Sequence, residues 1–269
     1  MKKLLLFAIL LIFIATTSYC ENETLVIKEI NLEMVKCPAG SFMMGSSKEV
    51  KKDSNHLFAF GFYYSEKPHL ISVSKPFYIG KYELTQYQYE SIIGNNPSEF
   101  RNINNPVERV NWNEAKEYCT KLNQKYSNLI PNGYRFDLPT EAQWEYACRA
   151  GTNTNFNNGT DNKIDEVAWY WGNSQGGLYF SRPVGQKKPN AWGIYDMHGN
   201  IAEWCNDWYS EYSDNGLIPL GETYIHYRVL RGGNSQNNLI NCSSTSRDYY
   251  SPDNCSPQIG FCVALVPID

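Results

Sequence analysis

The sequence predicts an α+β domain, on the basis of two segments with helical periodicity, several short apolar runs and frequent glycine, asparagine and proline between them. The chain has 269 residues, of which 42% are apolar and 14% aromatic, a composition typical of a folded domain and not of a disordered or collagen-like chain. Charged residues make up 19% and the net charge is -4, so no basic field for nucleic acid is present.

Two helices are expected, over Asn111–Lys125 and Thr140–Ala150. In each segment apolar residues recur at helical spacing and form one face. The first residue of each segment also has a capping-box partner three positions later, Glu114 in the first and Gln143 in the second. These are the main helices that the pattern predicts.

Strands are expected at short apolar runs bounded by turn residues, namely Phe77–Ile79, Tyr227–Leu230 and Phe261–Val266. Many loops connect them. No linker, charge block or internal repeat divides the rest of the chain, so residues 32–269 are expected to form one domain.

The first twenty residues are typical of a secretory signal peptide. Lys2 and Lys3 precede the apolar run Leu4–Ala15, and small polar residues follow. As a helix this run spans only about 18 Å, short of the ~30 Å hydrocarbon core of a bilayer, which argues against a membrane anchor. Residues 21–31 are expected to be a short polar leader.

Cys20 offers an alternative, because bacterial lipoproteins carry a lipidated cysteine directly after the apolar run. The preceding residue, Tyr19, is larger than the usual one. Either signal predicts export to the periplasm, the cell surface or the extracellular space, with a membrane contact only through a lipid on Cys20. Export places the other cysteines in an oxidising compartment, where pairing is the default.

Familiar catalytic motifs are absent. The sequence has no phosphate-binding loop, no Gly-x-Ser-x-Gly elbow and no Cys-x-x-Cys pair. Its four histidines lack metal-ligand spacing, so a zinc or non-haem iron site is not expected.

Several longer segments do carry a resemblance. In chain order they are 34–45 (MVKCPAGSFMMG), 81–85 (KYELT), 105–112 (NPVERVNW), 138–147 (LPTEAQWEYA), 190–200 (NAWGIYDMHGN), 203–209 (EWCNDWY), 230–233 (LRGG) and 259–261 (IGF). This series resembles the sulfatase-modifying factor family, also called formylglycine-generating enzyme-like, over roughly residues 33–267. The resemblance implies a C-type-lectin-like fold with short strands and many loops.

The enzymes of this family oxidise a cysteine of a substrate protein to formylglycine with oxygen and a copper ion held by two thiolates. Cu(I) is soft and prefers such ligands. In this chain Asn237 stands at the place of the first copper cysteine, and Cys242 falls at the second place if no gap is opened. With a gap, Cys242 instead matches a cysteine that in many relatives faces the place of Cys148. Copper is therefore not expected.

The resemblance also implies a structural calcium site at Asp196, Gly199, Ile201 and Glu203. Two carboxylates and two backbone carbonyls are the hard oxygen ligands that calcium takes. The alternative is that Asp196 caps a turn and Glu203 pairs with an arginine.

For the cysteines, the resemblance implies a disulfide between Cys148 and Cys242, and it suggests a second one between Cys119 and Cys262, although Cys262 is one place out of register. Cys205 is expected to be a buried free thiol. Cys37 and Cys255 have no assigned role.

The segment 234–258 is rich in asparagine, serine and tyrosine, which supply adaptable hydrogen bonds and rigid contact area in antibody paratopes. It also resembles the varied region of diversity-generating retroelement targets that share this fold. We expect Ser235, Asn237, Tyr249 and Tyr250 to bind a ligand; the alternative is a solvated polar loop.

The sequence thus predicts an exported, non-catalytic family member that binds a partner protein or surface ligand through its lectin-like face. The alternative is the formylglycine-generating oxidase itself. A sulfoxide synthase is least favoured, because those enzymes need an additional helical domain with an iron-binding histidine cluster.

Overall fold

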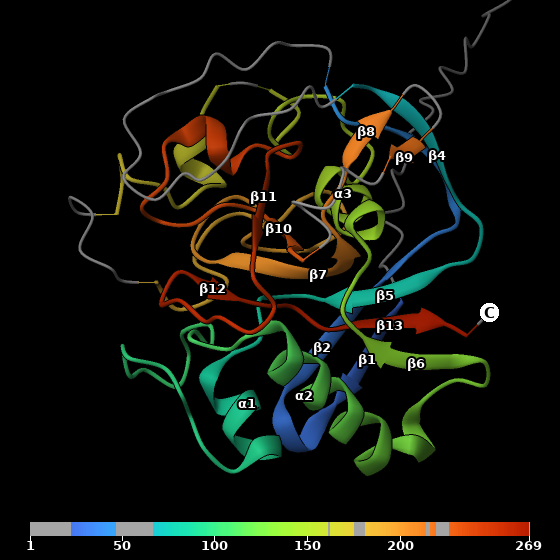
Figure 1. Ribbon diagram of the computed structural model, residues 1–269, viewed down its shortest axis with the longest axis vertical. Coiled ribbons are helices and arrows are strands. Elements are labelled where there is room, and N and C mark those ends of the chain that lie inside the picture. Colours follow the sequence, from blue (N-terminus) through green and yellow to red (C-terminus); the bar gives the residue numbers. More distant parts are fainter. Residues whose placement is uncertain are drawn as a thin grey trace, which may run out of the picture.

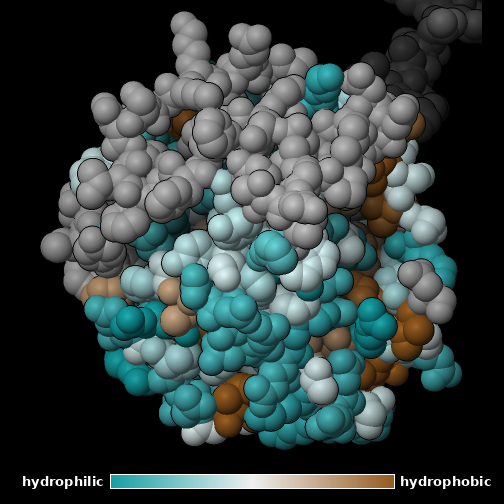
Figure 2. Space-filling model, in the orientation of Figure 1, coloured by the Kyte–Doolittle hydropathy of each residue, from teal (hydrophilic) through white to brown (hydrophobic). Residues whose placement is uncertain are grey.

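The computed structural model describes residues 23–46, 67–160, 162–174, 181–213, 216–218 and 226–268. The predicted signal peptide, residues 1–20, and Cys20 lie outside these ranges. Within them no helix has the length and apolar character needed to cross a bilayer. The face in Figure 2 is mainly hydrophilic where it is coloured, with apolar residues scattered over it.

The larger sheet has five antiparallel strands in the order β1-β2-β5-β13-β6 (Figure 1). Helices α1 and α2 contact each other beside it, and α3 contacts β3, β7 and β10 instead. The bounds are β1 Thr24–Ile27, β2 Leu32–Cys37, β5 Phe77–Gly80, β6 Tyr134–Asp137, β13 Ala264–Pro267, α1 Gln86–Ile93, α2 Trp112–Lys125 and α3 Glu141–Arg149.

A four-stranded sheet, ordered β11-β10-β7-β12, forms the second layer, and two hairpins, β3-β4 and β8-β9, stand apart from it. Strands β7, β10 and β11 pair antiparallel, and β12 joins β7 in parallel. The bounds are β3 Gly40–Met44, β4 His69–Val73, β7 Ala202–Trp208, β8 Glu211–Ser213, β9 Gly216–Ile218, β10 Arg228–Arg231, β11 Arg247–Tyr250 and β12 Ile259–Gly260, with short 3-10 helices η1 Lys28–Ile30, η2 Ser127–Leu129, η3 Ile164–Glu166 and η4 Leu239–Cys242.

The predicted α+β class is confirmed. Both predicted helices are present, with capping boxes at Asn111 and Thr140 as expected. A third helix, α1, was not predicted. Of the predicted strands, Phe77–Ile79 is confirmed within β5, Tyr227–Leu230 corresponds to β10, and Phe261–Val266 is a strand only from Ala264 onward.

Alternate side chains of residues 261–265 belong to two different hydrophobic clusters. Phe261, Val263 and Leu265 face the larger cluster, which contains Cys119 of α2, whereas Cys262 faces the smaller one. Cys119 and Cys262 are both free. The suggested Cys119–Cys262 disulfide is therefore absent, because a shift of one residue turns a side chain to the opposite face.

The leader expected over 21–31 belongs, from Thr24 on, to the domain. Strand β1 pairs with β2, and Ile27 and Ile30 are fully buried in the larger cluster. Two isoleucines three residues apart give too short a pattern for sequence analysis to recognise as core.

Candidate functional site

Three loops, 169–174, 196–201 and 232–237, meet beside the four-stranded sheet. Backbone hydrogen bonds hold them together, so their positions do not depend on side-chain packing alone. These bonds run from Trp169 N to His198 O (2.9 Å), from Asn200 N to Trp169 O (3.1 Å) and from Trp171 N to Asn237 O (3.0 Å).

Ser235 and Asn237 lie together in this cluster and shape it. The Asn237 side chain accepts a hydrogen bond from Asn234 N (2.9 Å), and Asn237 N donates to Asn234 O (2.9 Å). Ser235 is buried, and its carbonyl accepts a hydrogen bond from Ser174 Oγ at 2.5 Å. Both residues belong to a loop closed by these hydrogen bonds, in which Asn234 Oδ1 also accepts from Gln236 N at 2.9 Å and so forms an Asx turn.

Tyr249 and Tyr250 lie elsewhere, on β11. Adjacent strand residues point to opposite faces, and the ring contacts show this. Tyr249 packs against Tyr209, with ring centroids 4.5 Å apart, while Tyr250 packs against Trp204 at 6.3 Å. The four expected ligand-binding residues therefore do not converge on one ligand, since the two tyrosines face apart.

Cys148 on α3 and Cys242 at the end of η4 are fully buried, free thiols. They approach the same imidazole: Cys148 Sγ lies 3.9 Å from His198 Nε2, and the Cys242 carbonyl is 2.8 Å from His198 Nδ1. Cys148 Sγ also donates to Met197 O, and Cys242 Sγ donates to Asn234 O. The expected bridge is thus not formed in this reduced structure, and the pairing stays a prediction for the oxidised protein.

The two residues that the sequence analysis compared with the copper pair, without a gap, are Cys242 and Asn237, one thiol and one amide. Burial raises the pKa of Cys242 to about 12, so this group is a neutral thiol at physiological pH. Asn237, at the other place, has its side-chain oxygen engaged within the loop. A single buried thiol does not provide two thiolates for Cu(I).

Below the loops lie the carboxylates expected to bind calcium. Burial raises the pKa of Asp196 to about 6 and that of Glu203 to about 7. The structure adds a third carboxylate, Glu83, whose oxygens accept hydrogen bonds from Ile201 N (3.0 Å) and the Asn200 amide (2.6 Å). Burial, followed by the charges of Asp196 and Glu203, raises the pKa of Glu83 well above its usual range.

One oxygen of this cluster has no partner. Asp196 Oδ2 accepts from Gly185 N at 2.6 Å, but the buried Oδ1 has no hydrogen bond. Glu203 is held by Trp144 Nε1 at 2.6 Å. In the described part of the chain no three His, Cys, Asp or Glu side chains group as a metal site, so a cation here would also need backbone carbonyls. The unpartnered Asp196 oxygen fits a calcium ion.

Sequence analysis missed Glu83 as a member of this cluster. The only signal was its position in the segment KYELT, which carries part of the resemblance. Nothing in the sequence shows that it lies against Asn200 and Ile201, more than a hundred positions away.

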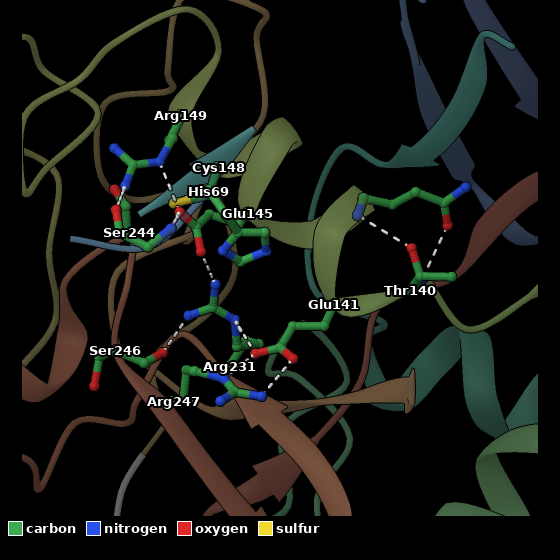
Figure 3. A network of polar contacts seen from close by, with 12 residues as sticks. His69, Thr140, Glu141, Glu145, Cys148, Arg149, Arg231, Ser244, Ser246 and Arg247 are labelled. Atoms are coloured by element: carbon green, nitrogen blue, oxygen red, sulfur yellow. Dashed lines mark hydrogen bonds and ion pairs between the residues drawn. The ribbon is translucent and has the colours of Figure 1, made fainter. Parts of the chain in front are cut away.

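A buried ion network connects α3 to β10 and β11 (Figure 3). Glu145 pairs with Arg149 (2.8 Å) and with Arg231, and Glu141 pairs with Arg231 (3.3 Å) and Arg247 (2.5 Å). All five side chains are buried or nearly so. Because each charge has a partner, the network can fix how the helix sits against the sheet.

This combination of an α+β domain with little regular structure, loops tied by backbone hydrogen bonds and a buried carboxylate cluster defines a sulfatase-modifying-factor-like class. Residues 25–266 match the family described as sulfatase-modifying factor enzyme 1-like domain, and the chain belongs to this family.

Individual relatives agree with this assignment. The chain is 39% identical over 192 residues to the chaperone protein LppX of Paenibacillus barcinonensis, covering 55% of this chain and 66% of that protein. It is 29% identical over 183 residues to the mouse formylglycine-generating enzyme, covering 62% and 46% respectively. The solved structure of Treponema denticola variable protein 1 superposes with a TM-score of 0.74 at 27% identity, covering 91% of this chain and 99% of that one. The matches thus span 66% and 46% of the lengths of the two sequence relatives.

Proposed function

We propose that the chain is an exported, non-catalytic member of this family that binds a partner protein or surface ligand. The observation that carries the proposal is the chemistry at Asn237. An amide stands where the family's oxidases need a thiolate, and it closes a loop by hydrogen bonds to Asn234. Without the second thiolate the copper chemistry has no ligand set.

Two features support binding. The relative LppX is named as a chaperone, which is a protein that acts on other proteins. In this chain the loop of Asn237 holds the backbone of Trp171, whose side chain is 51% exposed. An exposed tryptophan on a backbone fixed by hydrogen bonds provides contact area at a low entropic cost.

Export is supported by the charged start and apolar run of residues 2–15, and anchoring, if Cys20 is acylated, would be through lipid. Mass spectrometry of the protein from its native cells tests this. We expect the chain to begin at or directly after Cys20, with a mass that shows whether Cys20 carries lipid. A chain that retains Met1 would contradict export.

The alternative function is the formylglycine-generating oxidase. The discriminating assay incubates the reduced mature protein with Cu(I), oxygen and a Cys-x-Pro-x-Arg peptide, with a formylglycine-generating relative as positive control. We expect no mass change that matches formylglycine. If the product forms and Cys242→Ala abolishes it, the protein is an oxidase.

Partner binding is tested by a photo-crosslinking residue at position 171. The matched control is the same residue at Leu129, which is 41% exposed at the end of η2. In whole cells we expect defined crosslinked species at position 171 only. Equal labelling at both positions would contradict a specific binding face.

We further propose calcium as a structural ion at Asp196 and Glu203, with carbonyl ligands from Gly199 and Ile201. When bound, the ion would neutralise the buried carboxylates and leave the loop positions fixed. Its role would be structural and not catalytic.

A further inference from the structure

Two buried thiols, Cys205 and Cys262, lie at neighbouring positions beside the four-stranded sheet. Strand β12 pairs in parallel with β7 and ends at Gly260, which stands opposite Glu203. Continuing this register by two positions sets Cys262 opposite Cys205. Neighbouring strands lie about 4.8 Å apart, and the Cα atoms of a disulfide lie about 4.4–6.8 Å apart, so this spacing suits a bridge.

The side chains on either side of the segment support this register. Phe261 and Trp204 both belong to the larger hydrophobic cluster, whereas Cys262 and Cys205 both belong to the smaller one. Alternate residues of an extended chain point to opposite faces, so the two cysteines point to the same side. Both are free thiols in the structure, as the sequence predicted for Cys205.

Two other buried cysteines are placed less well as partners for Cys262. Cys119 belongs to the larger cluster, on the other side of the segment. Cys37 shares the smaller cluster, but it stands opposite Phe77 of β5, whereas Cys262 lies beside Gly80. Three residues along a strand span about 10 Å, which is beyond the reach of a disulfide.

We propose that Cys205 and Cys262 form a disulfide in the exported protein. The inference rests on the proposed function for its oxidant, a small disulfide or a disulfide-bonded oxidoreductase of an oxidising compartment. One cysteine thiolate attacks the S–S bond of the oxidant and releases its first thiol, and the second cysteine thiolate displaces the other. The two cysteines lose two protons and two electrons, and one disulfide oxidant is reduced to two thiols.

Burial decides when the bridge can form. It raises the pKa of both thiols well above their usual range, and the neighbouring Glu203 and Cys205 raise the pKa of Cys262 further. Because the thiolate is the reactive form, these thiols react slowly in the folded protein. The bridge therefore forms during folding, before the smaller cluster closes around it.

The bridge would tie together the two sheets. Cys262 lies in the segment 261–263, which connects β12 of the four-stranded sheet to β13 of the five-stranded sheet (Figure 1). Cys205 lies in β7, an inner strand of the four-stranded sheet. The bridge also closes a long loop of chain between the two cysteines, and such a cross-link stabilises a protein mainly by restricting its unfolded state.

The test refolds the reduced mature protein with reduced and oxidised glutathione and then maps its disulfides without reduction. Trypsin followed by chymotrypsin, which cleaves after Phe261, separates Cys262 from Cys255. We expect the peptide of Cys205 to be linked to that of Cys262, two hydrogen atoms lighter than the free peptides together. In the unfolded, non-reduced protein, Cys205→Ala should expose one additional thiol, at Cys262. The matched control Cys37→Ala, in the same cluster, should expose none.

Thermal unfolding gives a second readout. In the oxidised protein Cys205→Ala, Cys262→Ala and the double variant should all lower the melting temperature by a similar amount, roughly 5–15 °C, because each removes the same bridge. In the reduced protein the same variants remove packing only, so their losses should be severalfold smaller. Equal losses in both states would overturn the inference. If a variant does not fold, the disulfide map of the parent protein decides.

Free thiols at Cys205 and Cys262 after refolding, or a link from either to another cysteine, would also overturn the inference. The same map of protein from its native cells separates it from the proposed function. A bridge after refolding but free thiols in the native protein would uphold the pairing and contradict export. A native chain that begins at Cys20 and lacks the bridge in both samples would uphold export and reject the pairing.

Discussion

Asp196→Asn should stabilise the calcium-free protein at neutral pH. Asp196 is buried, one of its oxygens has no hydrogen-bond partner, and burial raises its pKa to about 6. Without a cation, ionising this group inside the protein costs free energy that a neutral amide of the same shape does not. Asparagine also suits the backbone here, because residue 196 has a φ of 57°, in the left-handed region.

The magnitude follows from the pKa. Burial raises the pKa of Asp196 from its ordinary value of 3.8 to about 6, which corresponds to about 3 kcal/mol at ~1.4 kcal/mol for each tenfold change in proton affinity. Because the folded state binds the proton more tightly, the contribution of Asp196 to stability falls as pH rises from about 4 to about 6. The gain from Asp196→Asn should therefore be near zero below pH ~4 and reach about 1–3 kcal/mol at pH 7.5, since the new amide hydrogens need acceptors.

Urea denaturation followed by tryptophan fluorescence checks this at pH 4, 6 and 7.5, with EDTA and with calcium. Calcium should stabilise the parent protein and leave Asp196→Asn nearly unchanged, because the variant has lost a charged ligand. Asp253→Asn, at an exposed position, is the control and should change stability by less than about 0.5 kcal/mol. The reasoning is refuted if Asp196→Asn is less stable than the parent in EDTA at pH 7.5 and calcium affects neither.

Three other predictions follow from buried groups. Glu145→Gln leaves the buried guanidinium of Arg149 without its charge partner and should cost about 3–5 kcal/mol of unfolding free energy, whereas Glu117→Gln in an exposed pair should cost under about 1 kcal/mol; equal losses in urea denaturation would contradict this. Gly199→Ala would place a Cβ against the carbonyl oxygen of Trp169 at a residue whose φ is 82°, so we expect a lower melting temperature than that of the parent. An unchanged melting temperature would contradict this. Mass mapping of the non-reduced mature protein should link Cys148 to Cys242, and free thiols at both positions would exclude the bridge.

Local signals in the sequence predicted the two helices whose buried face is mainly apolar, α2 and α3. Helix α2 follows from its apolar face and from the capping box at Asn111. Helix α1 was missed because Gln86 and Gln88 are buried along with Tyr89. The Gln86 amide donates a hydrogen bond to Phe100 O. This helix therefore buries hydrogen-bonded glutamine side chains at positions where helical periodicity is recognised by apolar residues.

The site was predictable only as far as the resemblance reached. It located Asp196, Glu203 and Asn237, since each stands in or beside a matched segment. It did not show that Tyr249 and Tyr250 face apart, because this segment was not predicted to be a strand, and adjacent residues of a strand point to opposite faces. Nor did it show that Glu83 joins the carboxylates, because that contact depends on the complete fold.

The apolar core and the loops are stabilised by different interactions, and this bears on function. Both sheets contribute apolar side chains to the core, for example Phe77 of β5 and Trp204 of β7, whereas the loop 196–201 also contains the buried carboxylate of Asp196 and is held by hydrogen bonds to Glu83. Charges that hold loops respond to pH and to cations, while an apolar core does not. Loss of calcium or a change of pH should therefore loosen the loops carrying Trp171 before the core unfolds. Binding through these loops would then depend on calcium concentration and on pH.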